Sequence, residues 1–180
     1  RTVQVGPLHV GGGSLITVQS MTTTDTRDAR ATLAQIAALA AAGADIVRVA
    51  VPDAAAARAL PAIVAAAAVP LVADIHFDYT LALAALDAGV AKLRINPGNI
   101  GAAGKVRAVA TAAGARKVPI RIGVNAGSLP RSLLARIERG ELSLGAGMAT
   151  AALDEARVLE DAGFDAIVLS VKAAQVPATL

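Results

Sequence analysis

The chain has 180 residues, the length of one domain or of part of a larger one, and 55% of them are hydrophobic although only 2% are aromatic. It contains no cysteine, which excludes disulfide bonds and thiolate metal sites within these residues, and no long apolar run or visible signal peptide, so a soluble cytoplasmic protein is expected. A net charge of +3 without any run of Lys or Arg argues against nucleic acid and favours a small anionic ligand.

The predicted elements begin with a hairpin at residues 3–10 that turns at Gly6-Pro7. We divide the chain into residues 1–14, which hold this hairpin and a glycine-rich joint, and residues 15–180, in which apolar strands alternate with helices. Asp25 or Asp28 could cap the first helix, which ends near Ala42. The strands are predicted at residues 15–21, 46–51, 71–76, 91–96, 119–125 and 166–172. The later helices are predicted at about residues 53–68, 80–88, 101–115, 132–138 and 149–162.

A repeat in the sequence precedes the strands. Three helices end in Ala-Gly just before a strand, at Gly43, Gly89 and Gly163, and Val-Pro pairs ending at Pro70 and Pro119 introduce the strands in between. This alternation through five successive strands is typical of a closed (β/α) barrel, in which odd and even strands fill different core layers. A doubly wound open sheet is the alternative. No Gly-x-Gly-x-x-Gly follows the first strand, which counts against a dinucleotide-binding version.

Continuous apolar strands that are separated by single helices favour a parallel sheet with both faces covered. Six strand–helix units can be counted, and the last of them lacks its helix. The predicted fold is therefore an α/β, (β/α)8 TIM-type barrel of which about six units are present, with the remaining units expected outside this sequence.

Barrel enzymes carry their functional groups at the carboxyl ends of the strands. At these ends, polar residues recur at even spacing, which puts the members of each pair on the same side of a strand. The residues selected in this way are Ser20 with Thr22, Arg48, Asp74 with His76, Arg94 with Asn96, Arg121 with Asn125, and Ser170 with Lys172. Three arginines and one lysine would then meet at one mouth, where arginine forks match the oxygens of a diphosphate or a similar anion.

Each of these residues also has a simpler interpretation. A single arginine at a strand end is more often a salt-bridge partner, and only the convergence of several favours a ligand site. His76 alone is as readily structural, but beside Asp74 it could donate a proton or a hydrogen bond to a ligand. Lys172 could form a Schiff base as in barrel aldolases, although a phosphate contact is the simpler interpretation.

Five segments of the sequence resemble one family closely. They are residues 18–28, with Val-Gln-Ser-Met-Thr, and residues 46–52, 71–78, 93–101 and 119–129. The runs Ala-Asp-Ile-His-Phe-Asp and Arg-Ile-Asn-Pro-Gly-Asn are the most specific of these. The family is 4-hydroxy-3-methylbut-2-enyl diphosphate synthase of the methylerythritol phosphate pathway of isoprenoid biosynthesis, and the resemblance covers nearly the whole chain in order.

The resemblance implies an oxidoreductase that opens the ring of 2-C-methyl-D-erythritol 2,4-cyclodiphosphate by a two-electron reduction, with ferredoxin or flavodoxin as the electron donor. It also implies a homodimer in which a C-terminal domain with a [4Fe-4S] cluster, held by three Cys and a Glu, closes over the partner's barrel. The residues that would hold the diphosphate are Arg48, Arg94, Asn96, Arg121, Asn125 and Lys172. Asp74 and His76 would line the same pocket as candidate catalytic residues.

The chain departs from the resemblance in one large respect, because it contains no cysteine. The cluster ligands are therefore expected in a C-terminal part outside this sequence, no cofactor-binding or metal-binding residue is assigned here, and these 180 residues alone are expected to be inactive. Two other functions remain open. One is an aldolase-type lyase that uses Lys172 on a phosphorylated sugar, and the other is a non-catalytic module that binds a phosphate ligand. Residues 128–147 resemble the family less, and nothing is assigned to them.

Overall fold

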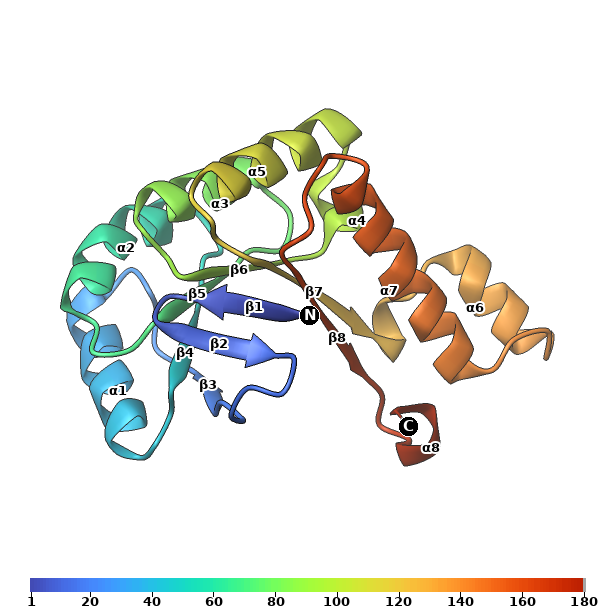
Figure 1. The fold of residues 1–180 in the computed structure, drawn as a ribbon, viewed down its shortest axis with the longest axis horizontal. Coiled ribbons are helices and arrows are strands. Elements are labelled where there is room, and N and C mark those ends of the chain that lie inside the picture. The colour runs from blue at the N-terminus through green and yellow to red at the C-terminus, as the bar shows by residue number, and fades with distance from the viewer. Residues whose placement is uncertain (180) are drawn as a thin grey trace.

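The computed structural model describes residues 1–179 and contains one curved sheet of six parallel strands (Figure 1). The strands lie side by side in chain order, so each one pairs with the next along the sequence. They are β3 (Gln19–Met21), β4 (Ile46–Ala50), β5 (Leu71–Asp74), β6 (Lys92–Ile95), β7 (Ile120–Asn125) and β8 (Ile167–Lys172).

Five helices form an arc along the convex side of this sheet (Figure 1). They are α1 (Ala29–Ala41), α2 (Ala54–Ala66), α3 (Tyr79–Asp87), α5 (Ala103–Ala115) and α7 (Leu144–Glu160). Consecutive parallel strands with right-handed crossovers put every helix on the same side of the sheet, whereas a doubly wound sheet has helices on both sides. The predicted barrel class is thus confirmed, and the alternative of a doubly wound sheet is wrong. The shorter helices are α4 (Pro97–Ile100), α6 (Arg131–Glu138), α8 (Val176–Thr179) and the 3-10 turn η1 (Ala126–Ser128).

Glycines end the helices where the repeat predicts. Gly43, Gly89 and Gly163 have φ angles of 96°, 85° and 80°, in the left-handed region that a residue with a Cβ avoids. Each of these glycines turns the chain from a helix into the following strand. Of the two candidate caps of α1, Asp28 caps it, because its Oδ1 accepts a hydrogen bond of 2.9 Å from the backbone N–H of Ala31.

Two helices differ from their predicted bounds because of glycine. The helix predicted at about residues 101–115 is α5, which begins at Ala103, because Gly101, whose φ angle is 106°, separates it from the short helix α4 that was not predicted. Helix α7 begins at Leu144, five residues before its predicted start, behind a cap at Ser143. Gly145 and Gly147 lower the helix propensity of this first turn, so the sequence pattern hides it. Packing explains Gly147, because a Cβ at this position would lie 2.7 Å from Cδ1 of Ile137 on α6.

The first strand of the sheet is shorter than predicted. The sequence predicts a strand over residues 15–21, but β3 begins at Gln19. The side chains of Leu15 and Ile16 are 92% and 95% exposed, and this part of the chain pairs with no other strand among residues 1–179. Because β3 is an outer strand with a neighbour on one side only, residues 15–17 have no partner strand within residues 1–179, although Val18 still accepts backbone hydrogen bonds from Asp45 and Ile46.

The predicted hairpin is present and covers one end of the sheet. Strands β1 (Thr2–Val5) and β2 (Leu8–Gly11) pair antiparallel, and Val5 is fully buried against Ile46 and Val72. Ile46 is the first residue of β4 and Val72 is the second residue of β5, so the hairpin closes the amino-terminal end of the barrel interior. The opposite end, at the carboxyl ends of the strands, is left for polar side chains.

The main core lies between the strands and the helices. It contains Val47 and Val49 of β4 and Leu93 and Ile95 of β6, all fully buried. Because side chains alternate along a strand, the residues between them, such as Arg48, face the inside of the curved sheet instead. In β4 and β6, the apolar residues Val47, Val49, Leu93 and Ile95 thus face the helices, whereas Arg48 and Arg94 face the barrel interior.

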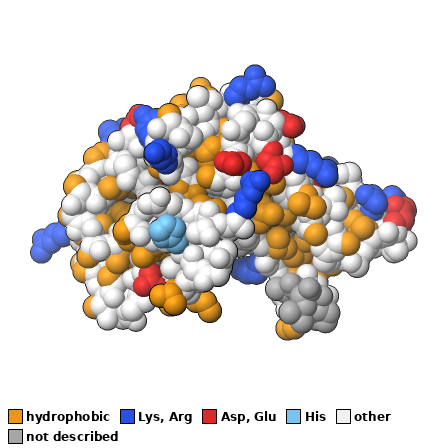
Figure 2. All heavy atoms as spheres, viewed as in Figure 1, with side chains coloured by type: hydrophobic (Ala, Val, Ile, Leu, Met, Phe, Trp, Pro, Cys, Tyr) orange, Lys and Arg blue, Asp and Glu red, His pale blue; other side chains and the backbone are white. Residues whose placement is uncertain are grey.

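The last strand and its helix carry an apolar surface patch. Leu153 and Val158 on α7 and Leu169 and Val171 on β8 are between 37% and 51% exposed. Figure 2 shows hydrophobic side chains gathered over α7 and β8. The outer edges of β3 and β8 both lack a partner strand within the described residues, so these six strands do not close into a barrel. None of the helices within residues 1–179 is long and apolar enough to span a bilayer.

Candidate anion-binding site

A pocket of about 380 Å³ lies at the carboxyl ends of β4 to β8. Its lining residues are Arg48, Asp74, His76, Arg94, Arg121, Gly123, Asn125, Ser170 and Lys172. The sheet register brings them together, because Asp74 pairs with Arg94, Arg94 with Arg121, and Asn125 with Lys172 across neighbouring strands. Seven of the eight residues that the sequence assigns to the diphosphate or to catalysis line this pocket, and Asn96 is the exception.

Asp74 is the carboxylate around which the pocket is arranged. It is 5% exposed, and its Oδ1 accepts a hydrogen bond of 3.1 Å from Nη1 of Arg94. Arg48 Nε lies 3.6 Å from its Oδ2, and His76 Nε2 lies 3.5 Å from its Oδ1. One buried carboxylate therefore holds two arginines and a histidine in place, which leaves a surplus of positive charge.

Arg121 and Lys172 add to this surplus. Arg121 donates a hydrogen bond of 2.6 Å from Nη2 to Oγ of Ser170, and neither cation has a carboxylate partner among residues 1–179. Burial and the positive charges of Arg48 and Arg94 lower the pKa of Arg121, which means that its charged form is held in an unfavourable environment. An anion in the pocket would relieve this repulsion. The site is therefore suited to a ligand with more than one negative charge.

Two residues that sequence reasoning missed shape the pocket. Met21 Sδ lies 3.1 Å from Nε and 3.0 Å from Nη2 of Arg48, so a thioether supports this guanidinium. At Gly123 an added Cβ would lie 3.0 Å from Nη2 of Arg94, so the glycine makes room for that side chain. The predicted pair Ser20 and Thr22 lies on the opposite face of the chain, because Met21 is the residue that faces the interior.

Asn96 lies beside the pocket and caps α4. It is 7% exposed, and its Oδ1 accepts a hydrogen bond of 3.2 Å from the backbone N–H of Asn99. Glu155 of α7 also forms a side-chain hydrogen bond with Asn96. Burial raises the pKa of Glu155 to about 7, although Asn96 and the positive charge of Arg94 oppose this shift. Glu155 Oε2 is buried and has no hydrogen-bond partner among the described residues.

Replacing Glu155 by glutamine is expected to raise the free energy of unfolding, and the gain should depend on pH. Its pKa in the folded chain lies above the unfolded value, so the folded state binds more protons and loses stability as the pH rises toward 7. Since the carboxylate is partly solvated and its charge is screened, we expect Glu155→Gln to raise the free energy of unfolding by only about 1 kcal/mol at pH 8 and by little at pH 5. Urea unfolding at both pH values measures this, with Glu160→Gln on the exposed face of α7 as the control. An equal effect of Glu155→Gln at both pH values would contradict the assignment.

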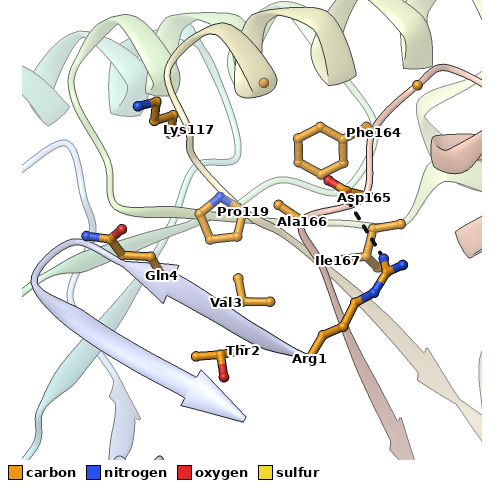
Figure 3. Close-up of a pocket in the computed structure, with 12 residues that line it drawn as sticks. Arg1, Thr2, Val3, Gln4, Lys117, Pro119, Phe164, Asp165, Ala166 and Ile167 are labelled. Atoms are coloured by element: carbon orange, nitrogen blue, oxygen red, sulfur yellow. Dashed lines mark ion pairs between the residues drawn. The ribbon is translucent and has the colours of Figure 1, made fainter. Parts of the chain in front are cut away.

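A larger cavity, of about 500 Å³, lies at the opposite end of the sheet (Figure 3). It is formed by β1 and by the segments that lead into β7 and β8, and includes Pro119, Phe164 and Ile167. Its ion pair, Arg1 with Asp165 at 3.8 Å, joins two side chains that are at least 80% exposed. Barrel functions are located at the carboxyl ends of the strands, and this cavity has no cluster of buried charges, so we assign the site to the cationic pocket.

The described residues do not provide a metal or cluster site. Among residues 1–179 no three His, Asp or Glu side chains converge on one point, and the sequence has no cysteine. An iron–sulfur cluster with thiolate ligands therefore does not fit the residues of this chain.

Comparison with known proteins places the chain in a family. The family model described as the GcpE TIM-barrel domain matches residues 1–180. A 4-hydroxy-3-methylbut-2-en-1-yl diphosphate synthase (flavodoxin) of Magnetococcus marinus is 56% identical over the whole chain, which covers 48% of that protein. The protein of the same name from Geobacter sulfurreducens is 54% identical over the whole chain, which covers 50% of it. The chain thus spans about half the length of these curated relatives.

Solved structures support the fold. Dihydropteroate synthase of Xanthomonas albilineans aligns with a TM-score of 0.62 at 17% identity over 93% of this chain and 65% of that one. The dihydropteroate synthase of Yersinia pestis aligns with a TM-score of 0.61 at 16% identity over 93% and 61% of the two chains. At such low identity these two structures bear on the fold alone. The match of the family model over residues 1–180 establishes that the chain belongs to the GcpE TIM-barrel domain family.

Proposed function

We propose that this chain is the substrate-binding barrel of a 4-hydroxy-3-methylbut-2-en-1-yl diphosphate synthase. The reaction is the reductive ring opening of 2-C-methyl-D-erythritol 2,4-cyclodiphosphate to the linear allylic diphosphate. The observation that carries the proposal is the cationic pocket, in which Arg48, Arg94, Arg121 and Lys172 surround the single carboxylate of Asp74. Such a surplus of charge is unfavourable in an empty pocket and is neutralised by a diphosphate.

The residues of the pocket and its surroundings would have different roles. Arg48, Arg94, Arg121, Asn125 and Lys172 contact the diphosphate. Asp74 orients two of these arginines. The side chain of His76 is 53% exposed beside Asp74, so it is positioned to give a hydrogen bond or a proton to the ligand. Asn96 does not line the pocket and its Oδ1 caps α4, so a contact with the diphosphate would have to come from its amide nitrogen.

The electrons would come from outside this chain. The names of the relatives include flavodoxin, which supports flavodoxin as the donor. We further propose a [4Fe-4S] cluster with its ligands in the other half of the full-length protein, and a homodimer in which that half meets the partner's barrel. The lack of cysteine supports this division, since the barrel residues supply no thiolate. The cluster would supply electrons, and the barrel would hold the ring and exclude water.

A chimera tests this function. Residues 1–180 replace the corresponding half of the Geobacter sulfurreducens relative, and turnover of the cyclic diphosphate is followed with reduced flavodoxin. We expect turnover, and its loss on Arg121→Met. A chimera that is folded, carries its cluster and binds the cyclic diphosphate without turnover would support the non-catalytic module instead. Borohydride trapping of a phosphorylated sugar on Lys172 would support the aldolase-type lyase.

A further inference from the structure

Lys92 is a buried cation that the proposed function does not use. It is the first residue of β6 and is 4% exposed. It lies two residues before Arg94 on the same face of the strand, which places it roughly 7 Å deeper in the barrel. Below it, the hairpin closes the barrel with the apolar cluster around Val5 and Val72. Lys92 therefore lies between the apolar floor of the barrel and the ring of arginines.

The surroundings of Lys92 are cationic or neutral. Its Nζ donates a hydrogen bond of 3.1 Å to Oε1 of Gln19 on β3, a neutral acceptor. Arg48 of β4 and Arg121 of β7 face it with positive charge, and β5 places Val72 opposite it in the register. No carboxylate forms an ion pair with Lys92 within residues 1–179. Burial lowers the pKa of Lys92, and the positive charges of Arg121 and Arg48 lower it further, to about 8.

We propose that Lys92 is the innermost cation of the anion site and that it takes up a proton when a diphosphate binds. The inference rests on the proposed function only for the identity of the ligand. A dianion held in the pocket cancels the repulsion that Arg48 and Arg121 exert on Lys92 and adds an attraction of its own. Both effects favour the charged amine. Binding and protonation are therefore linked, and the affinity falls as the pH rises through the range in which free Lys92 loses its proton.

Calorimetric titration of the chain with the cyclic diphosphate at pH 8, in two buffers with different ionisation enthalpies, measures the proton uptake. Each phosphorus of this ligand has one ionisable oxygen, so its charge is constant near pH 8. If binding raises the pKa of Lys92 by about one unit, the wild-type chain takes up about 0.4 proton per ligand. Lys92→Met should take up almost none, and it should bind about tenfold more weakly than wild type at pH 7.

Two further variants keep the test decisive. Lys92→Arg retains the charge at every pH, so it should bind without proton uptake even if Lys92→Met does not fold. Glu155→Gln removes a second buried group with a shifted pKa, about 7 in the folded chain, and it should keep the wild-type uptake. Equal uptake in wild type and in the Lys92 variants would overturn the proposal. If the cyclic diphosphate binds to none of them, the proposed function fails, and the same titration with sulfate, whose charge is also fixed, still decides the role of Lys92.

Discussion

Replacing Asp74 by asparagine is expected to lower the free energy of unfolding by about 3 kcal/mol or more. Asp74 is 5% exposed and is the carboxylate partner of both Arg48 and Arg94, with His76 in addition. Without its charge, the two guanidinium groups remain in the barrel interior and repel each other. Removing one partner of a buried ion pair is far more destabilising than removing one at the surface, because the remaining charge is left uncompensated.

Urea unfolding of the chain measures this effect, with Asp154→Asn as the matched control. Asp154 forms an ion pair of 3.1 Å with Arg157, but both side chains are more than half exposed. Its loss should change the free energy of unfolding by at most about 0.5 kcal/mol. Sulfate should restore more stability to Asp74→Asn than to the wild type, since an anion can take the place of the lost carboxylate. Equal effects of the two substitutions would contradict the role of Asp74.

Arg121→Met is expected to have opposite effects on binding and on stability. Arg121 is bound to the neutral Ser170 and is repelled by Arg48 and Arg94. Its removal should therefore raise the free energy of unfolding by about 0.5 to 1 kcal/mol, since a partly buried, unpaired charge is lost. The affinity for the cyclic diphosphate should fall by about 100-fold, because a bidentate contact is lost. Ligand titration and urea unfolding of the same preparation measure both effects.

Lys117→Gln is the control for this substitution. Lys117 lines the larger cavity at the amino-terminal end of the sheet, so its loss should leave binding of the cyclic diphosphate unchanged. A fall in both stability and affinity on Arg121→Met would indicate that Arg121 holds the fold together instead of serving the ligand. An unchanged affinity would remove it from the site.

Much of the fold could be predicted because local signals determine it. Gly43, Gly89 and Gly163 each end a helix through a left-handed backbone conformation that needs no distant contact. The polar residues at strand ends were equally visible, since a charged side chain such as Arg94 or Arg121 is rare in the apolar strands of a parallel sheet unless it has a partner or a ligand there. Even spacing along each strand then predicted which of these side chains share a face.

The remainder depends on long-range contacts. Around β3 both Gln19 with Met21 and Ser20 with Thr22 are evenly spaced, and only pairing with β4 decides which pair faces inward. The hydrogen bond between Gln19 and Lys92 joins residues 73 positions apart, and no local pattern reports it. The role of Glu155 arises in the same way, because α7 brings it to Asn96 from a segment in which nothing marks it as part of a site.

A crystal structure of this chain with the cyclic diphosphate is the most direct test of whether the cationic pocket binds the diphosphate. We expect the two phosphate groups to lie at the carboxyl ends of the strands, within hydrogen-bond distance of Arg94 and Arg121. Arg121 should then turn from Ser170 toward the ligand. Diphosphate bound in the other cavity, beside Arg1 and Lys117, with the cationic pocket unchanged, would contradict it.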